Sequence, residues 1–460
     1  MEETISMRSL AVYLKNYKKE SILAPFFKFL EVVFDLLVPI VIARIIDIGI
    51  ARNDHGLVVR NFLILILMAA AGLTVSITAQ YFAAKASVGF ATELRQAAFD
   101  HVQGLSYTEL DTLGTDTLIT RLTDDINQVQ NGVNMGLRLL LRSPFIVLGS
   151  MVMAFTINVR CALIFVVAIP VLFLAVFVIM YLSIPLFRKV QNRLDTVTGL
   201  TRENLTGVRV IRAFCREKEA VQEFDESNYQ LTKLNEFVGK LSALLNPVTY
   251  VLINIATVIL INTAGIQVNL GNMQQGEVVA LYNYMAQMII ELIKLASLII
   301  TLNKSAACAG RVANILQVNT SMNYQNSDPA SVSGDCAVEF RNVRFTYAGA
   351  SAESISDLSF TVKKGQTVGI IGGTGSGKST LVNLISRFYD VSEGSVLLNG
   401  QNIKDYPQQS LRDKIGVVPQ KAVLFKGSIR DNMKWGREDA TDSEIWDALT
   451  TAQAKEIVKA

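Results

Sequence analysis

Apolar residues dominate roughly the first 300 positions of the chain and form six long windows. Each window approaches the roughly 20 residues that a helix needs to cross a bilayer. The windows lack the polar–apolar alternation of barrel strands, so each is predicted to be a helix. The six predicted spans are residues 22–50, 60–86, 139–159, 161–183, 242–264 and 277–301.

Charged residues interrupt some of these windows. Charge inside a membrane is costly, so such side chains tend to face a cavity. A second group of candidates for contact with a substrate is a set of Tyr, Met and Gln residues in span six, because flexible methionine side chains can adapt to substrates of different shapes. Ordinary helix–helix packing, or placement at cytosolic helix ends, is the alternative for both groups. The candidates are Glu31, Asp35, Glu291 and Lys294, and then Tyr282, Tyr284, Met285, Gln287 and Met288.

The distribution of basic residues predicts how the spans are oriented. Ten Lys and Arg residues lie between Arg188 and Lys240, whereas the segment TAGIQVNLGNMQQG has none. Because basic loops stay in the cytosol, both termini and the two long connections are predicted to be cytosolic. The segment Ser9–Glu20 is predicted to form a short amphipathic helix on the membrane surface.

The two long connections also carry apolar residues at helical spacing. Each is predicted to continue two membrane helices into the cytosol and to turn near Gly114 or Gly207. Such extensions can contact a soluble domain, and Arg121 and Arg209 beside the turns are candidates for coupling the two parts.

Composition supports a membrane protein and excludes other classes. Half of the 460 residues are hydrophobic and 18% are charged. The net charge of +3 is small, and no basic patch is interleaved with aromatic residues, which argues against nucleic acid as a partner. The cysteines lack metal-ligand spacing, so neither a zinc site nor a disulfide framework is expected. They are Cys161, Cys215, Cys308 and Cys336.

A polar segment, Val318–Asp335, is predicted to be a linker, and a soluble α/β domain follows it. There, GGTGSGKS fits the phosphate-binding pattern G-x-x-x-x-G-K-[ST] at every fixed position. TVGII before it is predicted to be a strand and STLVNLISRF after it a helix. The predicted nucleotide-binding residues are Gly372, Gly373, Thr374, Gly375, Ser376, Gly377, Lys378, Ser379 and Thr380.

The expected ligand of this loop is ATP with Mg²⁺. Lys378 is predicted to reach the β and γ phosphates, and the Ser379 hydroxyl to coordinate Mg²⁺. Tyr347 follows a predicted strand and is a candidate for stacking on adenine. Gln420 follows the apolar segment KIGVVP, also predicted to be a strand, where its amide can bind Mg²⁺ or water and report the γ-phosphate. Packing for Tyr347 and solvation for Gln420 are the alternatives.

With these motifs in place, the chain resembles a half-size bacterial ABC exporter of the multidrug-resistance type over nearly its whole length. GGTGSGKST resembles the family's Walker A motif, Tyr347 its A-loop tyrosine, and VVPQ its Q-loop at Gln420, with LFKGSIRDN as the usual continuation. GTDTLITRLTDDINQV and ENLTGVRVIRAF resemble the segments that carry coupling helices. The resemblance implies an all-α transmembrane domain with six helices and long cytosolic extensions, followed by an incomplete α/β P-loop nucleotide-binding domain.

The resemblance also implies the domain limits and the function. The expected parts are residues 1–20 (N-terminal helix), 21–317 (transmembrane domain), 318–335 (linker) and 336–460 (nucleotide-binding domain). The expected function is export of amphipathic or hydrophobic compounds across the bacterial plasma membrane by a dimer with a second half-transporter, identical or not. Alternatives are a lipid or peptide exporter of the same fold, or an ATP-binding regulatory subunit without turnover. An importer is disfavoured.

The sequence departs from the family pattern in one respect. It contains no LSGGQ-like signature, no Walker B aspartate followed by a glutamate, and no histidine in the nucleotide domain. The expectation is therefore a C-terminally truncated chain that binds nucleotide but does not hydrolyse ATP at a normal rate.

Overall fold

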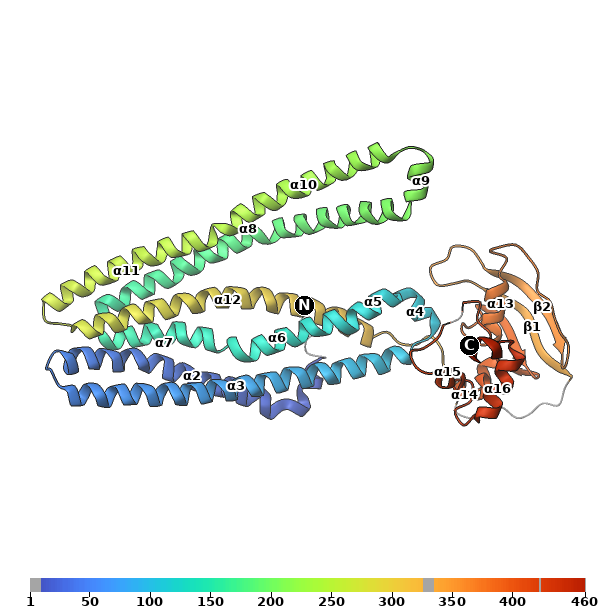
Figure 1. Cartoon of the computed structure of the whole chain (residues 1–460), viewed down its shortest axis with the longest axis horizontal. Coiled ribbons are helices and arrows are strands. Elements are labelled where there is room, and N and C mark those ends of the chain that lie inside the picture. Colours follow the sequence, from blue (N-terminus) through green and yellow to red (C-terminus); the bar gives the residue numbers. More distant parts are fainter. Residues whose placement is uncertain (1–9, 326–334, 422, 460) are drawn as a thin grey trace. The chain divides into compact units, whose positions relative to one another are not determined.

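The computed structural model describes residues 10–325, 335–421 and 423–459, and these form two compact units. The first unit comprises the described residues up to Leu105 together with Glu109–Asn319. The second comprises Ser106–Thr108 together with the described residues from Thr320 onward. Figure 1 shows the first unit as long helices and the second as a small sheet with short helices.

The first unit is entirely helical. Its 3₁₀ and π segments are η1 (Ala11–Tyr17), η2 (Ile45–Ile50) and η3 (Arg121–Asp125). Its α-helices are α2 (Lys18–Arg44), α3 (His55–Gln103), α4 (Tyr107–Leu113, shared with the second unit), α5 (Thr115–Thr120), α6 (Ile126–Leu139), α7 (Arg142–Ile157), α8 (Val159–Thr206), α9 (Val208–Ala213), α10 (Glu217–Ala243), α11 (Leu245–Asn269) and α12 (Gln275–Leu316).

All six predicted spans lie in helical regions. Among the described residues, five helical stretches are long and apolar enough to cross a membrane: His55–Gln103, Thr115–Ile157, Val159–Thr206, Glu217–Asn269 and Gln275–Leu316. The first predicted span corresponds to α2 with η2 and is not among the five, since α2 carries several charged residues. The predicted N-terminal helix is the 3₁₀ helix η1 leading into α2, and Ser9 lies outside the described residues.

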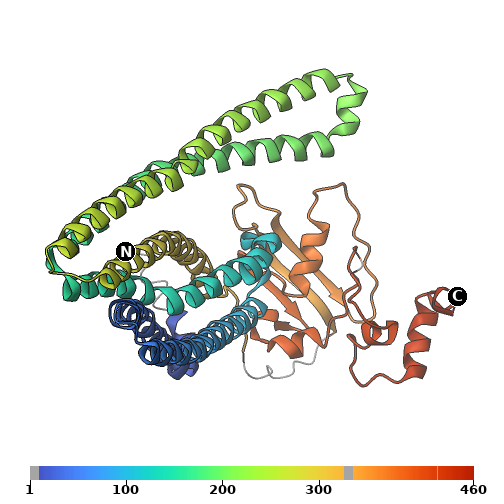
Figure 2. The ribbon, with the colours of Figure 1, turned by 60° about the vertical axis from the view of Figure 1, so that its left-hand side comes forward.

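The long connections are helical and break at the two predicted glycines. Gly114 separates α4 from α5 with a φ of +76°, and Gly207 separates α8 from α9. With 48 residues, α8 is about 72 Å long, more than twice the roughly 30 Å hydrocarbon thickness of a bilayer. Helices α8 and α10 form an arm that diverges from the other helices of this unit and ends in α9 (Figure 2).

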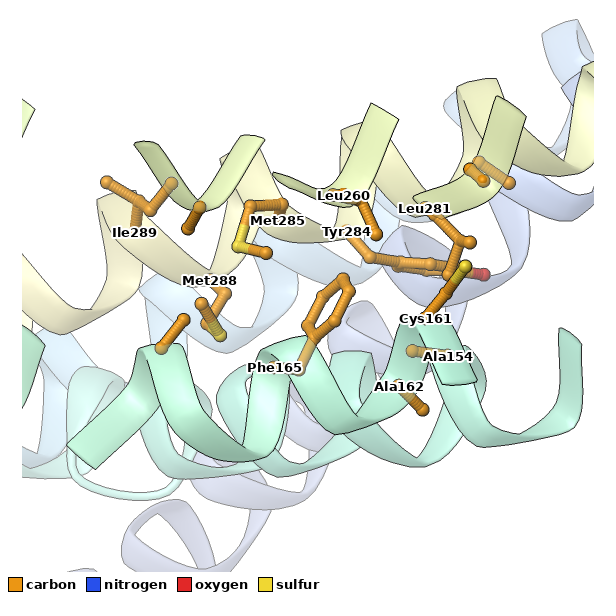
Figure 3. Close-up of a cluster of buried hydrophobic side chains, with 14 of the residues drawn as sticks. Ala154, Cys161, Ala162, Phe165, Leu260, Leu281, Tyr284, Met285, Met288 and Ile289 are labelled. Atoms are coloured by element: carbon orange, nitrogen blue, oxygen red, sulfur yellow. The ribbon is translucent and has the colours of Figure 1, made fainter. Parts of the chain in front are cut away.

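The largest apolar core of the first unit lies among α7, α8, α11 and α12. Phe165 of α8 is fully buried, and Leu260 of α11 and Tyr284 of α12 converge on it (Figure 3). Small side chains such as Ala154 and Ala162 allow the helices to approach closely.

The second unit contains a four-stranded antiparallel sheet of order β2-β1-β3-β4. Its strands are β1 (Cys336–Phe345), β2 (Ile355–Lys363), β3 (Glu393–Leu398) and β4 (Gln401–Asn402). Its helices are α13 (Lys378–Ile385), η4 (Ile403–Asp405), α14 (Gln408–Arg412), α15 (Ile429–Met433), α16 (Asp442–Thr451) and α17 (Lys455–Lys459). The core of this unit includes Phe340 and Phe345 of β1 and Leu384 of α13.

Two predicted strands are absent. Neither TVGII, residues 367–371, nor the segment 414–419 is a strand, although both are apolar. Ile371 is 95% exposed and Val418 is 96% exposed, and of these two segments only Ile415 is partly buried, against the core of the second unit. A strand needs a neighbour for its backbone hydrogen bonds, and the described sheet pairs none with these two segments. The predictions of a strand before the phosphate loop and of one before Gln420 are therefore wrong for this structure.

Candidate nucleotide site

The loop predicted to bind phosphate leads directly into α13, which confirms the predicted helix. Gly375 and Gly377 have φ values of +84° and +83°, a region that residues with side chains rarely adopt. A Cβ atom at Gly377, the N-cap of α13, would lie 2.8 Å from the carbonyl oxygen of Ser354. Conformation and space therefore both require glycine at Gly377. The amides of this loop and the N-terminus of α13 are donors suited to phosphate.

Lys378 closes over its own loop. Its ammonium group donates hydrogen bonds to the carbonyl oxygens of Gly372 (2.8 Å) and Gly373 (2.6 Å) and to the hydroxyl of Ser376 (3.3 Å). The positive charge is thus held at the loop, where phosphate oxygens can replace these acceptors. Ser379 is exposed in the first turn of α13.

Tyr347 lies beside this helix. Its hydroxyl shares a 3.0 Å hydrogen bond with the hydroxyl of Thr380, in the first turn of α13. Its ring meets Phe345 edge to face at 4.8 Å and Tyr389 at 5.2 Å between ring centroids. The structure thus brings the predicted adenine-stacking ring and the phosphate loop together.

Gln420 is not brought to the loop in the same way. It is exposed in a segment without regular secondary structure. Among the described residues, no hydrogen bond or salt bridge joins its side chain to the phosphate loop. Its predicted role in metal binding and catalysis stays a prediction.

The predicted metal ligands, Ser379 and Gln420, offer oxygen atoms. They fit Mg²⁺ bound together with a nucleotide better than a metal ion bound by side chains alone. Within the described ranges, no group of three or more His, Cys, Asp or Glu side chains is placed to hold a metal ion. Mg²⁺ in nucleotide sites takes only one or two protein oxygens besides phosphates and water. The Ser379 hydroxyl and the Gln420 amide oxygen are donors of that kind.

A buried arginine at the end of α13 was missed by sequence reasoning. Arg387 is 2% exposed and binds Asp390 at 2.8 Å. It also donates to the carbonyl oxygens of Asn323 (2.9 Å) and Lys404 (3.3 Å) and lies over the ring of Tyr324. It therefore fixes the described beginning of the predicted linker, whose residues 326–334 lie outside the described ranges. The only sequence signal was its place after the phosphate-loop helix.

The charged residues predicted within the spans meet at one arginine. Arg142 of α7 contacts Glu31 at 2.7 Å and Asp35 at 3.1 Å, both on α2, and Glu291 of α12 at 3.8 Å. Sequence reasoning did not single out Arg142. The carboxylates thus link three helices, in agreement with the packing alternative.

Two lysines complete this network. Lys28 binds Glu31 at 2.5 Å, and Lys294 binds Glu291 at 2.8 Å. Ser143 also donates to Glu291, at 2.8 Å. Three carboxylates thus face three cations, and the network is neutral with all groups ionised.

The candidate pocket residues of span six divide into two groups. Tyr284, Met285 and Met288 are at most 1% exposed and belong to the apolar core (Figure 3). Tyr282 is 49% exposed, and Gln287 is half-buried. The buried group again fits the packing alternative.

The helical extensions beyond the predicted spans hold a further ion pair. Arg311 of α12 binds Asp125, at the end of η3, with both ends of its guanidinium, at 2.8 and 2.5 Å. Burial raises the pKa of Asp125, but the hydrogen bonds with Arg311 and Cys308 and the positive charges of Arg311 and Arg121 together outweigh it, so the pKa lies below its ordinary value. Arg121 lies at the start of η3 and Arg209 in α9.

Long apolar helices together with a unit that carries a glycine-dependent phosphate loop define a multi-pass membrane protein that binds nucleotide. The family model of the ABC transporter transmembrane region matches residues 21–292, and a second family model, described as ABC transporter, matches residues 355–460. The chain belongs to the ABC transporter family.

Several relatives match almost the whole chain. An uncharacterized ABC transporter ATP-binding protein of Mycobacterium tuberculosis is 32% identical over 98% of this chain and 78% of its own length. YfiB of Bacillus subtilis, also an uncharacterized ABC transporter ATP-binding protein, has the same identity and coverage. YgaD of Bacillus subtilis, which is named for multidrug export, is 31% identical over 98% of this chain and 79% of its own length. The chain is shorter than these homologues.

Proposed function

We propose that this chain is one half of an ATP-driven exporter of amphipathic or hydrophobic compounds in the bacterial plasma membrane, with both termini in the cytosol. It works as a dimer with a second half-transporter. The observation that carries the proposal is the phosphate loop with Lys378 folded over it, on the same chain as five helices long enough to span a membrane. The name of YgaD supports export of several compounds.

The nucleotide is ATP with Mg²⁺, bound mainly through the phosphate loop. Lys378 exchanges its carbonyl acceptors for β- and γ-phosphate oxygens, and Ser379 and Gln420 provide oxygens for Mg²⁺. Tyr347 stacks on adenine. The sequence contains no LSGGQ-like signature, so this chain by itself is expected to bind ATP without rapid hydrolysis.

ATP drives transport through differential affinity for two conformations. Nucleotide bound between two nucleotide-binding units favours one arrangement of the membrane helices, and its loss favours the other. The turns at Gly114 and Gly207, with Arg121 and Arg209 beside them, are the proposed places where this change reaches the helices.

Nucleotide binding by the purified full chain tests the site. Lys378→Met is expected to weaken Mg-ATP binding at least tenfold, because a charge-assisted contact to phosphate is lost. Lys364→Met is the matched control, since Lys364 is exposed and lies before the phosphate loop. Equal ATP binding by the two variants would contradict the assignment.

Transport in sealed vesicles distinguishes the functions. With a partner half-transporter present, ATP-dependent movement of an amphipathic dye supports export, and Lys378→Met abolishes it. Movement of a labelled lipid or peptide but not of the dye favours the alternative substrates. ATP binding without movement of any of them favours a regulatory subunit.

A further inference from the structure

Tyr389 occupies the centre of an aromatic cluster beside the phosphate loop. Its ring lies 5.2 Å from that of Tyr347, 5.6 Å from that of Phe345 and 6.0 Å from that of Tyr107. Tyr389 is 9% exposed, so its position is set by these neighbours. Neither the phosphate-loop pattern nor the proposed metal site uses it.

Tyr347 is held at three points. Phe345 and Tyr389 meet its ring at interplanar angles of 82° and 83°, and Thr380 holds its hydroxyl. Edge-to-face neighbours and a fixed hydroxyl restrict ring rotation. Because Thr380 follows Ser379 in α13, this restraint also sets the ring relative to the phosphate loop.

Tyr107 contacts the same cluster from a distant part of the sequence. It belongs to the second compact unit and packs on Phe388 at 4.7 Å as well as on Tyr389. Tyr107 therefore adds a third aromatic contact to the ring of Tyr389, besides those with Tyr347 and Phe345.

We infer that Tyr389 is a positioning residue that holds the ring of Tyr347 for adenine. The edge-to-face contact of Tyr389 restricts the orientation of the Tyr347 ring before the base binds, so less freedom of that ring is lost when adenine stacks on it. The inference rests on the proposed function in one respect, that Tyr347 stacks on adenine.

The test compares how tightly the purified full chain binds Mg-ATP and magnesium tripolyphosphate. Tripolyphosphate has the phosphates of ATP but no base. Tyr389→Leu is expected to weaken ATP binding about threefold to tenfold and to leave tripolyphosphate binding unchanged, as expected for loss of one aromatic contact. Tyr389→Phe keeps the ring and is expected to keep the affinity for ATP. Phe340→Leu is the matched control, because Phe340 is a buried ring of the same unit that stacks on Phe360.

The outcomes separate the two ideas. If Tyr389→Leu binds ATP as the parent chain does, or loses equal affinity for both ligands, the positioning role of Tyr389 is overturned. The proposed stacking of Tyr347 on adenine is not affected by that result. A parent chain that binds ATP no more tightly than tripolyphosphate shows instead that adenine stacking fails, and the inference falls with it.

Discussion

At the scale of residues, the charge network around Arg142 is the costliest feature of the membrane part. Each ionised group must give up water, and only close partners offset that loss. The side chain of Glu291 is 4% exposed and that of Glu31 is 9% exposed, so both depend on their partners. Among the described residues, Arg142 is the one cation that contacts carboxylates of both α2 and α12.

Replacement of Arg142 by methionine is therefore expected to destabilise the helices strongly. Glu31, Asp35 and Glu291 would then face only Lys28 and Lys294, and loss of one partner from a buried pair costs about 3–5 kcal/mol. The measurement is the midpoint temperature of unfolding in detergent micelles. Arg160→Met, at an exposed site on α8, is the control, and equal midpoints for the two variants would refute this view of the network.

The sequence allows a prediction of site residues where their chemistry is local. The phosphate loop was identifiable because its glycines and Lys378 act within a few positions of one another. Arg387 and Tyr389 were missed because their partners, such as Asn323 and Tyr107, are far away in the sequence. Neither hydrophobic periodicity nor a local motif predicts contacts between residues so far apart in the sequence.

At the scale of elements, apolar periodicity predicted the helices and their breaks but overestimated the strands. A helix satisfies its own backbone, so α3 and α8 form wherever the pattern is long enough. A strand depends on a neighbour, and residues 367–371 and 414–419 are apolar but unpaired within the described sheet. Sequence pattern alone does not reveal whether such a neighbour is present.

Helix α16 offers an element whose end depends on pH. Its N-cap Thr441 and Glu444 form a capping box, and Glu444 also binds Arg437. The hydrogen bond from Arg437, followed by those from Thr441, lowers the pKa of Glu444 from 4.5 to about 2. A lowered pKa stabilises the fold above the unfolded value, so this contribution is expected to disappear as pH falls from about 4.5 to about 2.

The emission of Trp446, which lies in α16, reports this change in a Trp435→Phe background. The transition is expected between those pH values and is expected to vanish in Glu444→Gln, where the amide still accepts hydrogen bonds but does not titrate. The same transition in Glu444→Gln would assign it to another group.

At the scale of the whole molecule, the arm of α8, α9 and α10 stands out because several exposed apolar side chains gather at its tip, beside the arginines of α9. Leu205 is 71% exposed, Val210 60% and Phe214 74%. Exposed apolar clusters at the end of an extended arm indicate a surface that another chain covers. A half-size member of the ABC transporter family generally works as a dimer, so the expected occupant is the second half-transporter.

Phe214→Ser is therefore expected to impair transport without weakening ATP binding, because the phosphate loop belongs to the other compact unit. The measurements are dye movement in vesicles with the partner present and Mg-ATP affinity of the purified chain. Arg209→Ala changes a residue of the same tip. It is also expected to impair transport without weakening ATP binding, if the tip couples nucleotide binding to the membrane helices. Phe237→Ser, at an exposed site near the other end of α10, is the control. Full transport by Phe214→Ser would show that transport does not depend on contacts of this tip.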